Sequence, residues 1–128
     1  GTRAMLAEAR AIDRAAARFP GVQVALAPPF TLINAMRDAV ENIGVGGQDC
    51  HIQPSGAFTG DVSAPILADA GAGFAIVGHS ERRALHGETV DRVVSIPTVG
   101  HRSPARTLSI RLAQEQNEEI EHLSRLLD

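Results

Sequence analysis

The sequence predicts an α/β fold in which short parallel strands alternate with helices. Three apolar, β-prone runs, at 22–27, 43–47 and 74–77, are separated by segments whose apolar residues recur at helical spacing. This alternation implies a parallel sheet with right-handed crossovers. The third run ends in five polar residues, 79–83. A parallel sheet delivers such residues to the edge where α/β folds place their ligand sites.

The first part of the chain predicts two helices around a strand. Thr2 can cap a helix that runs to about Arg18. Its expected buried stripe consists of Met5, Ala9, Ile12, Ala16 and Phe19. The strand at 22–27 ends at two prolines, and a second helix is expected at about 31–41.

The middle of the chain predicts a long loop between a strand and a helix. The glycine-rich strand at 43–47 is followed by a loop at 48–60, whose length is usual for a functional segment. Ser63 then begins a helix that Gly71 ends. After the strand at 74–77, Ser80 begins another helix.

Composition excludes several classes of protein. The 128 residues are one domain's worth of chain, and 44% of them are hydrophobic, which is enough for a core. No apolar stretch is long enough to cross a membrane, and no secretory signal is recognised. A net charge of −3 argues against nucleic-acid binding. Cys50, the single cysteine, excludes an internal disulfide and fits a cytoplasmic location.

Four linked motifs carry a resemblance to a known family. The segment 77–83, Val-Gly-His-Ser-Glu-Arg-Arg, resembles the signature of the triosephosphate isomerase family. Three stretches precede it in the family's order and spacing: Ala-Pro-Pro at 27–29, Gly-Gly-Gln-Asp-Cys at 46–50, and Ser-Gly-Ala-Phe-Thr-Gly-Asp at 55–61. The resemblance covers about residues 1–89.

The resemblance implies a fold and a reaction. Residues 1–89 would form the second to fourth strand–helix units of a partial TIM (β/α) barrel, whose complete form takes about 250 residues. Residues 90–128 would be a divergent tail outside the family pattern, with a helix at 110–127. The implied reaction interconverts dihydroxyacetone phosphate and glyceraldehyde 3-phosphate, without cofactor or metal, in a homodimer.

The resemblance makes His79 the electrophile. The family's established arrangement pairs a neutral histidine with a carboxylate base. The predicted helix start beside His79 disfavours the imidazolium, which leaves a neutral ring that can donate to a substrate oxygen. The alternative is a histidine that only caps the turn. Ser80 would shape that turn at the rim of the site, and Glu81 would either shuttle protons or hold Arg82.

Further residues are assigned by their position in the chain and by the resemblance. Gln48 and Asp49, at a strand end, would lie at the substrate-site rim or form a polar network that holds the loop. Phe58 and Thr59 resemble the loop tip that enters the partner subunit in the family dimer, although Phe58 could also pack on its own domain. Arg82 would pair with an acidic neighbour or with the partner subunit.

Other parts of the family's machinery have no match. All twelve basic residues are arginine, so the family's lysine is absent, and no motif matches its carboxylate base or phosphate loops. We therefore expect the chain to be inactive alone, and the second hypothesis is a non-catalytic fragment or interaction module that retains the inter-subunit loop. The other histidines show no metal-ligand spacing: His51, His86, His101 and His122.

Overall fold

The fold is built on a parallel four-stranded sheet. The computed structural model describes residues 1–88 and 109–112. The strands are β1 (Ala25–Leu26), β2 (Gly44–Gly47), β3 (Phe74–Val77) and β4 (Ser109–Leu112). Their order in the sheet, β1-β2-β3-β4, is their order in the chain, and every neighbouring pair is parallel. The predicted parallel α/β arrangement is therefore confirmed.

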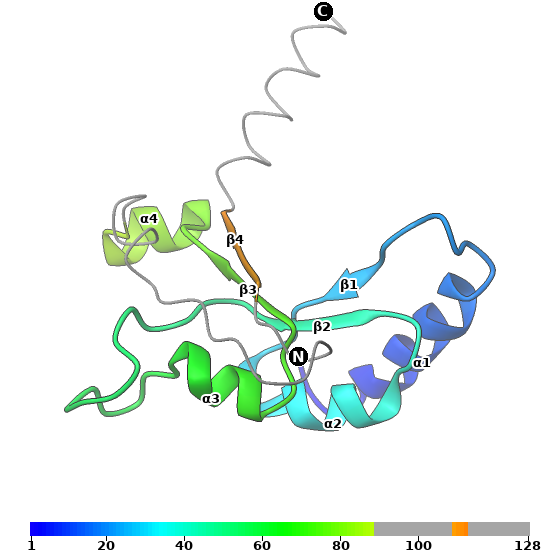
Figure 1. Cartoon of the computed structure of the whole chain (residues 1–128), viewed down its shortest axis with the longest axis horizontal. Helices are drawn as coiled ribbons and strands as arrows, with labels where there is room; N and C mark the ends of the chain where they lie inside the picture. The colour runs from blue at the N-terminus through cyan, green and yellow to red at the C-terminus, as the bar shows by residue number, and fades with distance from the viewer. Residues whose placement is uncertain (89–108, 113–128) are drawn as a thin grey trace, which may run out of the picture.

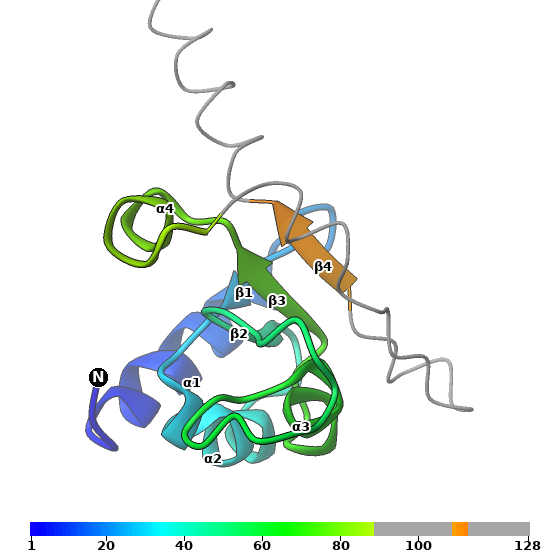
Figure 2. The same ribbon diagram turned by 90° about the vertical axis from the view of Figure 1, so that its left-hand side faces the viewer.

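The structure describes four α-helices and one 3₁₀ turn, and three of the α-helices cover one face of the sheet. They are α1 (Met5–Ala16), the 3₁₀ turn η1 (Phe30–Leu32), α2 (Ile33–Ala39), α3 (Ala64–Asp69) and α4 (Ser80–His86). Two perpendicular views show α1, α2 and α3 on the same side of the strands (Figures 1 and 2). The short helix α4 lies apart from them, directly after the C-terminal end of β3 (Figure 1). This arrangement leaves the C-terminal strand ends free for a site.

The hydrophobic core lies between the sheet and the three helices. Val45, Ala75 and Val77 contribute from the strands, and Ile33 and Leu67 contribute from α2 and α3. Ile33, Leu67 and Val77 are the largest side chains that are fully buried. Burial of a side chain of this size contributes about 1.5–3 kcal/mol.

Gly46 allows a close approach between β2 and β3. It pairs with Phe74 across the sheet. A Cβ atom at Gly46 would lie 2.5 Å from the Phe74 ring, which rules out any side chain unless the ring moves. The aromatic ring thus explains the glycine at 46, whereas a Cβ atom at Gly47 would meet the Leu67 side chain at 2.9 Å.

Asp13 ties α1 to the turn between α2 and β2. Its Oδ1 accepts the backbone N–H groups of Glu41, Asn42 and Ile43 at 3.0, 2.6 and 3.1 Å. Its Oδ2 accepts from the Asn42 side-chain amide at 3.2 Å. Burial works to raise the pKa of Asp13, but these hydrogen bonds outweigh it and the pKa lies below its ordinary value of 3.8.

The first helix is shorter than predicted, because its expected cap is not used. Thr2 makes no side-chain cap; the helix begins after Ala4, which lacks a capping group. Two members of the expected stripe, Met5 and Phe19, are 45% and 59% exposed. Phe19 lies beyond the helix end, so helical spacing no longer places it over the core.

A strand prediction and a helix prediction also differ from the structure. Of the run 22–27, only β1 is paired, and Val22 is 61% exposed. The predicted helix at 110–127 is wrong for residues 110–112, which belong to β4, while its remainder lies outside the described residues. The open edge of β3 offers unpaired backbone groups, and pairing with them takes precedence over helical periodicity.

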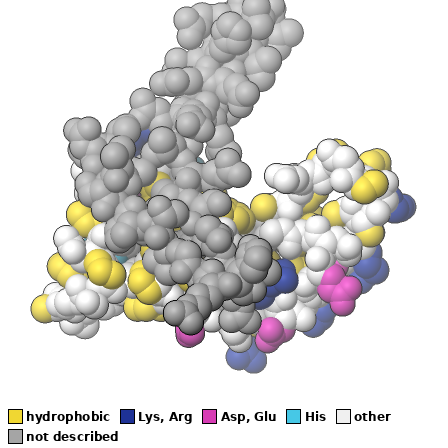
Figure 3. All heavy atoms as spheres, in the orientation of Figure 1, with side chains coloured by type: hydrophobic (Ala, Val, Ile, Leu, Met, Phe, Trp, Pro, Cys, Tyr) yellow, Lys and Arg dark blue, Asp and Glu magenta, His cyan; other side chains and the backbone are white. Residues whose placement is uncertain are grey.

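Figure 3 shows one face of the molecule. Charged side chains lie over the α1 and α2 side, and hydrophobic side chains are exposed both there and near the loop that joins β2 to α3. Among the described helices, none combines the length and the apolar character that a membrane span needs.

Candidate active site

A cleft of about 420 Å³ lies at the C-terminal ends of β1, β2 and β3. Five of the residues singled out from the sequence line it: Gln48, Asp49, His79, Glu81 and Arg82. The parallel topology brings them together, because the C-terminal ends of neighbouring parallel strands meet at one edge of the sheet. The cleft is therefore the candidate active site.

The remaining predicted site residues do not line this cleft. Ser80 is the exposed first residue of α4. Phe58 and Thr59 belong to the loop between β2 and α3, where Phe58 lines a separate small pocket with His51. The structure thus gathers the polar residues of two strand ends and places the loop tip elsewhere.

A left-handed glycine positions His79. Gly78 follows β3 with φ 66°, a conformation that costs a residue with a Cβ atom about 1–2 kcal/mol. The chain then turns at His79, whose extended backbone makes it the N-cap of α4. The short polar run after a buried strand thus folds as a strand–turn–helix unit that presents the imidazole at the sheet edge.

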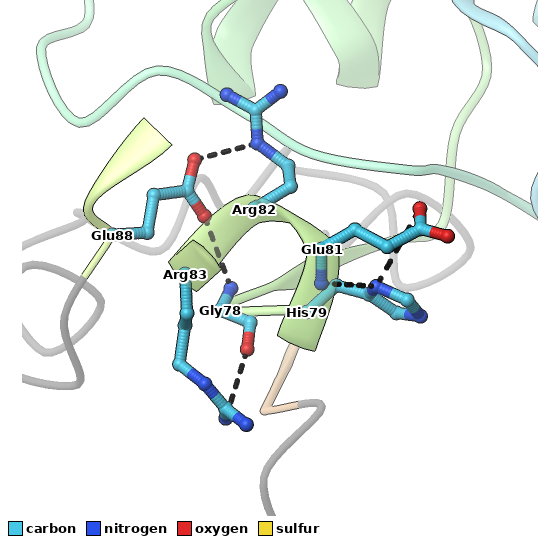
Figure 4. A network of polar contacts seen from close by, with 6 residues as sticks. All are labelled: Gly78, His79, Glu81, Arg82, Arg83 and Glu88. Carbon is cyan, nitrogen blue, oxygen red and sulfur yellow. Dashed lines mark hydrogen bonds and ion pairs between the residues drawn. The ribbon is translucent and has the colours of Figure 1, made fainter. Parts of the chain in front are cut away.

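The His79 ring uses one nitrogen for the cap and leaves the other for the cleft. Its Nδ1 accepts the backbone N–H of Glu81 at 3.3 Å (Figure 4). A neutral imidazole whose Nδ1 accepts a hydrogen bond carries its proton on Nε2. The side chain is 47% exposed, so Nε2–H is available as a donor. Capping and donation are therefore compatible in one residue.

Glu81 lies beside His79 without holding Arg82. Its carboxylate is 3.9 Å from His79 Nδ1, too far for a hydrogen bond, and its side chain is 81% exposed. The 3.3 Å contact from its backbone N–H is the closer of the two, and it determines which nitrogen carries the proton. Among the described residues, the carboxylates that bind Arg82 are Asp49 and Glu88.

Arg82 connects two elements beneath the cleft. Its Nη2 lies 2.9 Å from Asp49 Oδ2, just after β2, and its Nε donates to Glu88 Oε1 at 2.6 Å. Burial lowers the pKa of Arg82, but the hydrogen bond to Glu88 and the charges of Asp49, Glu88 and Asp61 outweigh it and raise the pKa above its ordinary value. The guanidinium is thus a fixed cation held by carboxylates of its own chain.

The backbone of Gly78 is held from both sides. Its N–H donates to Glu88 Oε2 at 3.3 Å, and its carbonyl accepts from Arg83 Nη1 at 3.2 Å. Figure 4 shows these two contacts on either side of the turn that carries His79. The residue next to the imidazole therefore has both of its backbone polar groups bonded to side chains.

Several residues at the site were not predicted. Glu88 is only 8% exposed, although nothing in the local pattern marks it as buried. Phe30 and Leu85 form apolar parts of the cleft wall, and His86 joins them. The only signal for Glu88 is its place after Gly87, whose φ of 64° turns the chain back towards the site.

Gln48 forms a hydrogen bond that joins two strand ends, and Cys50 is a buried thiol. Gln48 Nε2 donates to the backbone carbonyl of Ala27 at 3.0 Å, which links the ends of β1 and β2. Burial raises the pKa of the Cys50 thiol to about 11, with further contributions from the charges of Asp49 and Glu88. Such a thiol is protonated at neutral pH and is unsuited to act as a nucleophile.

The loop between β2 and α3 carries its own contacts. The rings of His51 and Phe58 lie with their centroids 4.1 Å apart, and His51 Nε2 is 3.6 Å from Asp61 Oδ2. Phe58 nevertheless remains 41% exposed. Within residues 1–88, no group of three or more histidine, cysteine or acidic side chains is arranged to hold a metal ion.

Comparisons with known proteins agree with the resemblance. Residues 2–98 match the family model "Triosephosphate isomerase". The triosephosphate isomerase of Dinoroseobacter shibae is 57% identical over 90 residues, which cover 69% of this chain and 36% of that protein. The isomerase of Caulobacter vibrioides is 51% identical over 96 residues, covering 73% and 38%.

A solved structure shows the same fold. The crystal structure of triosephosphate isomerase from Bartonella henselae is similar with a TM-score of 0.70 and 40% identity, over 75% of this chain and 40% of that one. The present chain thus spans little more than a third of the length of the curated relatives it matches.

Proposed function

The chain belongs to the triosephosphate isomerase family, and on that basis we propose that its cleft is the electrophilic half of a site that interconverts dihydroxyacetone phosphate and glyceraldehyde 3-phosphate. The observation that carries the proposal is the contact between Glu81 N–H and His79 Nδ1. It leaves Nε2–H of His79 as the donor, at the mouth of a cleft formed by strand ends.

The chemistry needs a donor where charge develops. Removal of a proton from the carbon next to the carbonyl of a triose phosphate produces an enediolate, whose negative charge lies on oxygen. A donor already oriented towards that oxygen stabilises the transition state, and loss of one such donor typically costs about 10²–10³-fold in kcat. His79 Nε2–H would serve as this donor, with Gln48 and Asp49 at the rim.

We expect these 128 residues to bind the substrate without turnover. The sequence contains no lysine. Of the carboxylates that line the cleft, Asp49 is paired with Arg82, and Glu81 is exposed and lies on the Nδ1 side of His79. Because no motif in the rest of the sequence matches the family's base, we expect the proton-abstracting base to come from another polypeptide.

The test combines binding with turnover. Dihydroxyacetone phosphate is added to the ¹⁵N-histidine-labelled chain, and the His79 ring resonances are followed by NMR beside a coupled isomerase assay, with His79→Gln as control. We expect the His79 resonances to shift and no turnover to occur. If the protein is folded and its His79 resonances do not shift at millimolar substrate, the proposal is contradicted. Turnover that His79→Gln abolishes would support the role of His79 and correct the expected inactivity.

We also propose that the chain associates as a homodimer through the loop between β2 and α3. The exposed Phe58 and Thr59 support this proposal, since an aromatic side chain at a loop tip gains from burial against a partner. The second candidate function, a non-catalytic interaction module, rests on the same loop. The reducing surroundings inferred from the single cysteine make the cytoplasm the proposed location.

A further inference from the structure

We propose that Glu88 is a positioning residue for His79, and this rests on the electrophilic role proposed for His79 above. Glu88 neither contacts His79 nor lines the cleft itself; it acts through the backbone of Gly78 and through Arg82. Its effect is to fix the direction in which the imidazole points. The evidence is the way its two carboxylate oxygens are used.

Each oxygen of Glu88 has a different partner. Oε1 accepts from Arg82 Nε at 2.6 Å, and Oε2 accepts from the Gly78 backbone N–H at 3.3 Å (Figure 4). The side chain is buried, with 6% of its surface exposed, so water competes little for these bonds. The left-handed conformation of Gly87 brings the carboxylate back beneath the turn.

The Gly78 contact controls the orientation of the next residue. Gly78 has no side chain to hold its conformation, and its φ of 66° is one of several that a glycine adopts freely. A change in the backbone dihedral angles of Gly78 would move His79 away from the sheet edge. Glu88 on the N–H and Arg83 on the carbonyl remove that freedom.

The Arg82 contact holds α4 in place relative to the end of β2. Because Arg82 also pairs with Asp49, a chain of contacts runs from the end of β2, through α4, to the segment after α4. The backbone N–H that meets His79 Nδ1 belongs to Glu81, the neighbour of Arg82. A shift of α4 would therefore break the bond that keeps the proton on Nε2.

Glutamine cannot replace Glu88 in this arrangement. Both partners, Arg82 Nε–H and Gly78 N–H, are donors, and a carboxylate offers two acceptor oxygens where an amide offers one. In Glu88→Gln, one of the two donors must face an NH₂ group. The substitution keeps the size of the side chain and removes one of its two functions.

The test compares Glu88→Gln with Glu41→Gln. Glu41 is exposed near the start of β2, at the opposite end of the sheet, so its substitution is a matched control. The first readout is the His79 tautomer, from ¹⁵N resonances of the labelled ring. We expect a single Nε2–H tautomer in the wild type and in Glu41→Gln, and a mixture of both tautomers in Glu88→Gln.

A second readout follows the Glu81 amide by hydrogen exchange. Loss of its bond to His79 should speed exchange about tenfold in Glu88→Gln, because one hydrogen bond is lost. A purely structural role would lower the melting temperature and leave the tautomer and this relative protection unchanged. That result in a folded Glu88→Gln protein would overturn the inference.

One further measurement on the wild type supports the test. If Glu88→Gln does not fold, the wild-type Gly78 amide is measured instead: protection supports its bond to Glu88, and exchange as fast as in a free loop contradicts it. Failure of the proposed function would give a different result. The His79 ring resonances would then not shift on addition of dihydroxyacetone phosphate, either in the wild type or in Glu88→Gln.

Discussion

At the scale of single residues, carboxylates join elements that are far apart in the chain. Asp13 holds three consecutive backbone N–H groups of the turn before β2, 28 to 30 residues away. Glu88 holds the turn after β3 in a similar way, through one backbone N–H and Arg82. In both cases an acidic side chain satisfies donors that the strands and helices leave unpaired.

The hydrogen bonds of Asp13 make stability sensitive to acid. Its pKa is lowered in the folded state, so its contribution is complete above the unfolded value near 3.8 and is lost as the pH falls through that value towards the folded one. We expect Asp13→Asn to be less stable than the wild type at pH 7 and to lose less stability between pH 5 and pH 3. Urea unfolding at several pH values measures both effects.

The matched control for this prediction is Asp38→Asn. Asp38 is exposed on α2. This variant should keep the acid profile of the wild type. An Asp13→Asn protein with the same acid profile as the wild type would show that the Asp13 hydrogen bonds do not contribute to the pH dependence.

Sequence patterns located His79 and missed Glu88 and Asp13, for a physical reason. His79 follows directly on an apolar strand, and the local pattern marks that junction. The roles of Glu88 and Asp13 depend on backbone groups that come near them only after folding, such as Gly78 and the turn at 41–43. Local periodicity carries no information on such partners.

At the scale of elements, the unit from β3 to α4 is specified most strongly. Four apolar residues form β3, and left-handed glycines stand on both sides of α4, at Gly78 and Gly87. Gly87 ends the helix, and its N–H donates to the Arg82 carbonyl. Two glycine positions therefore specify the turn geometry at the site.

Gly87→Ala tests this turn chemistry without adding a steric clash. A Cβ atom at Gly87 would meet nothing within 4 Å, so the expected cost of about 1 kcal/mol comes from the left-handed φ alone. Gly21→Ala is the matched control, because its surroundings are equally open and its φ is not positive. We expect that variant to be neutral or slightly stabilising.

Chemical denaturation of the two glycine variants decides the outcome. If both variants are destabilised equally, the effect comes from replacing glycine as such. The left-handed conformation at Gly87 would then make no contribution of its own. A destabilisation confined to Gly87→Ala supports the turn geometry.

Element boundaries were predictable only where packing and pattern agree. The pattern at 74–77 and the strand β3 coincide, because Ala75 and Val77 are buried in the core. The run at 22–27 is also β-prone but contains Gln23, and only Ala25 and Leu26 form a strand, since Val22 is exposed to solvent. The alternation of Ile110 and Leu112 with polar residues suits a strand, but only the open edge of β3 decides between strand and helix there.

At the scale of the whole molecule, the described part is a sheet with helices on one face and a cleft at one end. Figure 1 shows the β2–α3 loop reaching away from this body, and Figure 3 shows hydrophobic surface near it. Phe58 on this loop is 41% exposed despite its contact with His51. Its exposure supports the proposed association between copies of the chain.

Phe58→Asp tests the proposed association. A charge at the loop tip would oppose burial against a partner, so we expect the mass measured by analytical ultracentrifugation to fall towards that of a monomer. Phe19→Asp is the matched control, because Phe19 is 59% exposed and lies just after α1, outside this loop. Its mass should equal that of the wild type. A wild type that is monomeric at all concentrations would contradict the homodimer.

The strand order has a consequence for synthesis on the ribosome. Among the described strands, each pairs with the one made immediately before it, so spatial order and order of translation coincide. Every new strand therefore emerges next to a partner that has already left the exit tunnel, and the loops to be closed stay short. The sheet can grow by one strand at a time while the chain is still being made, with no need to wait for a later segment.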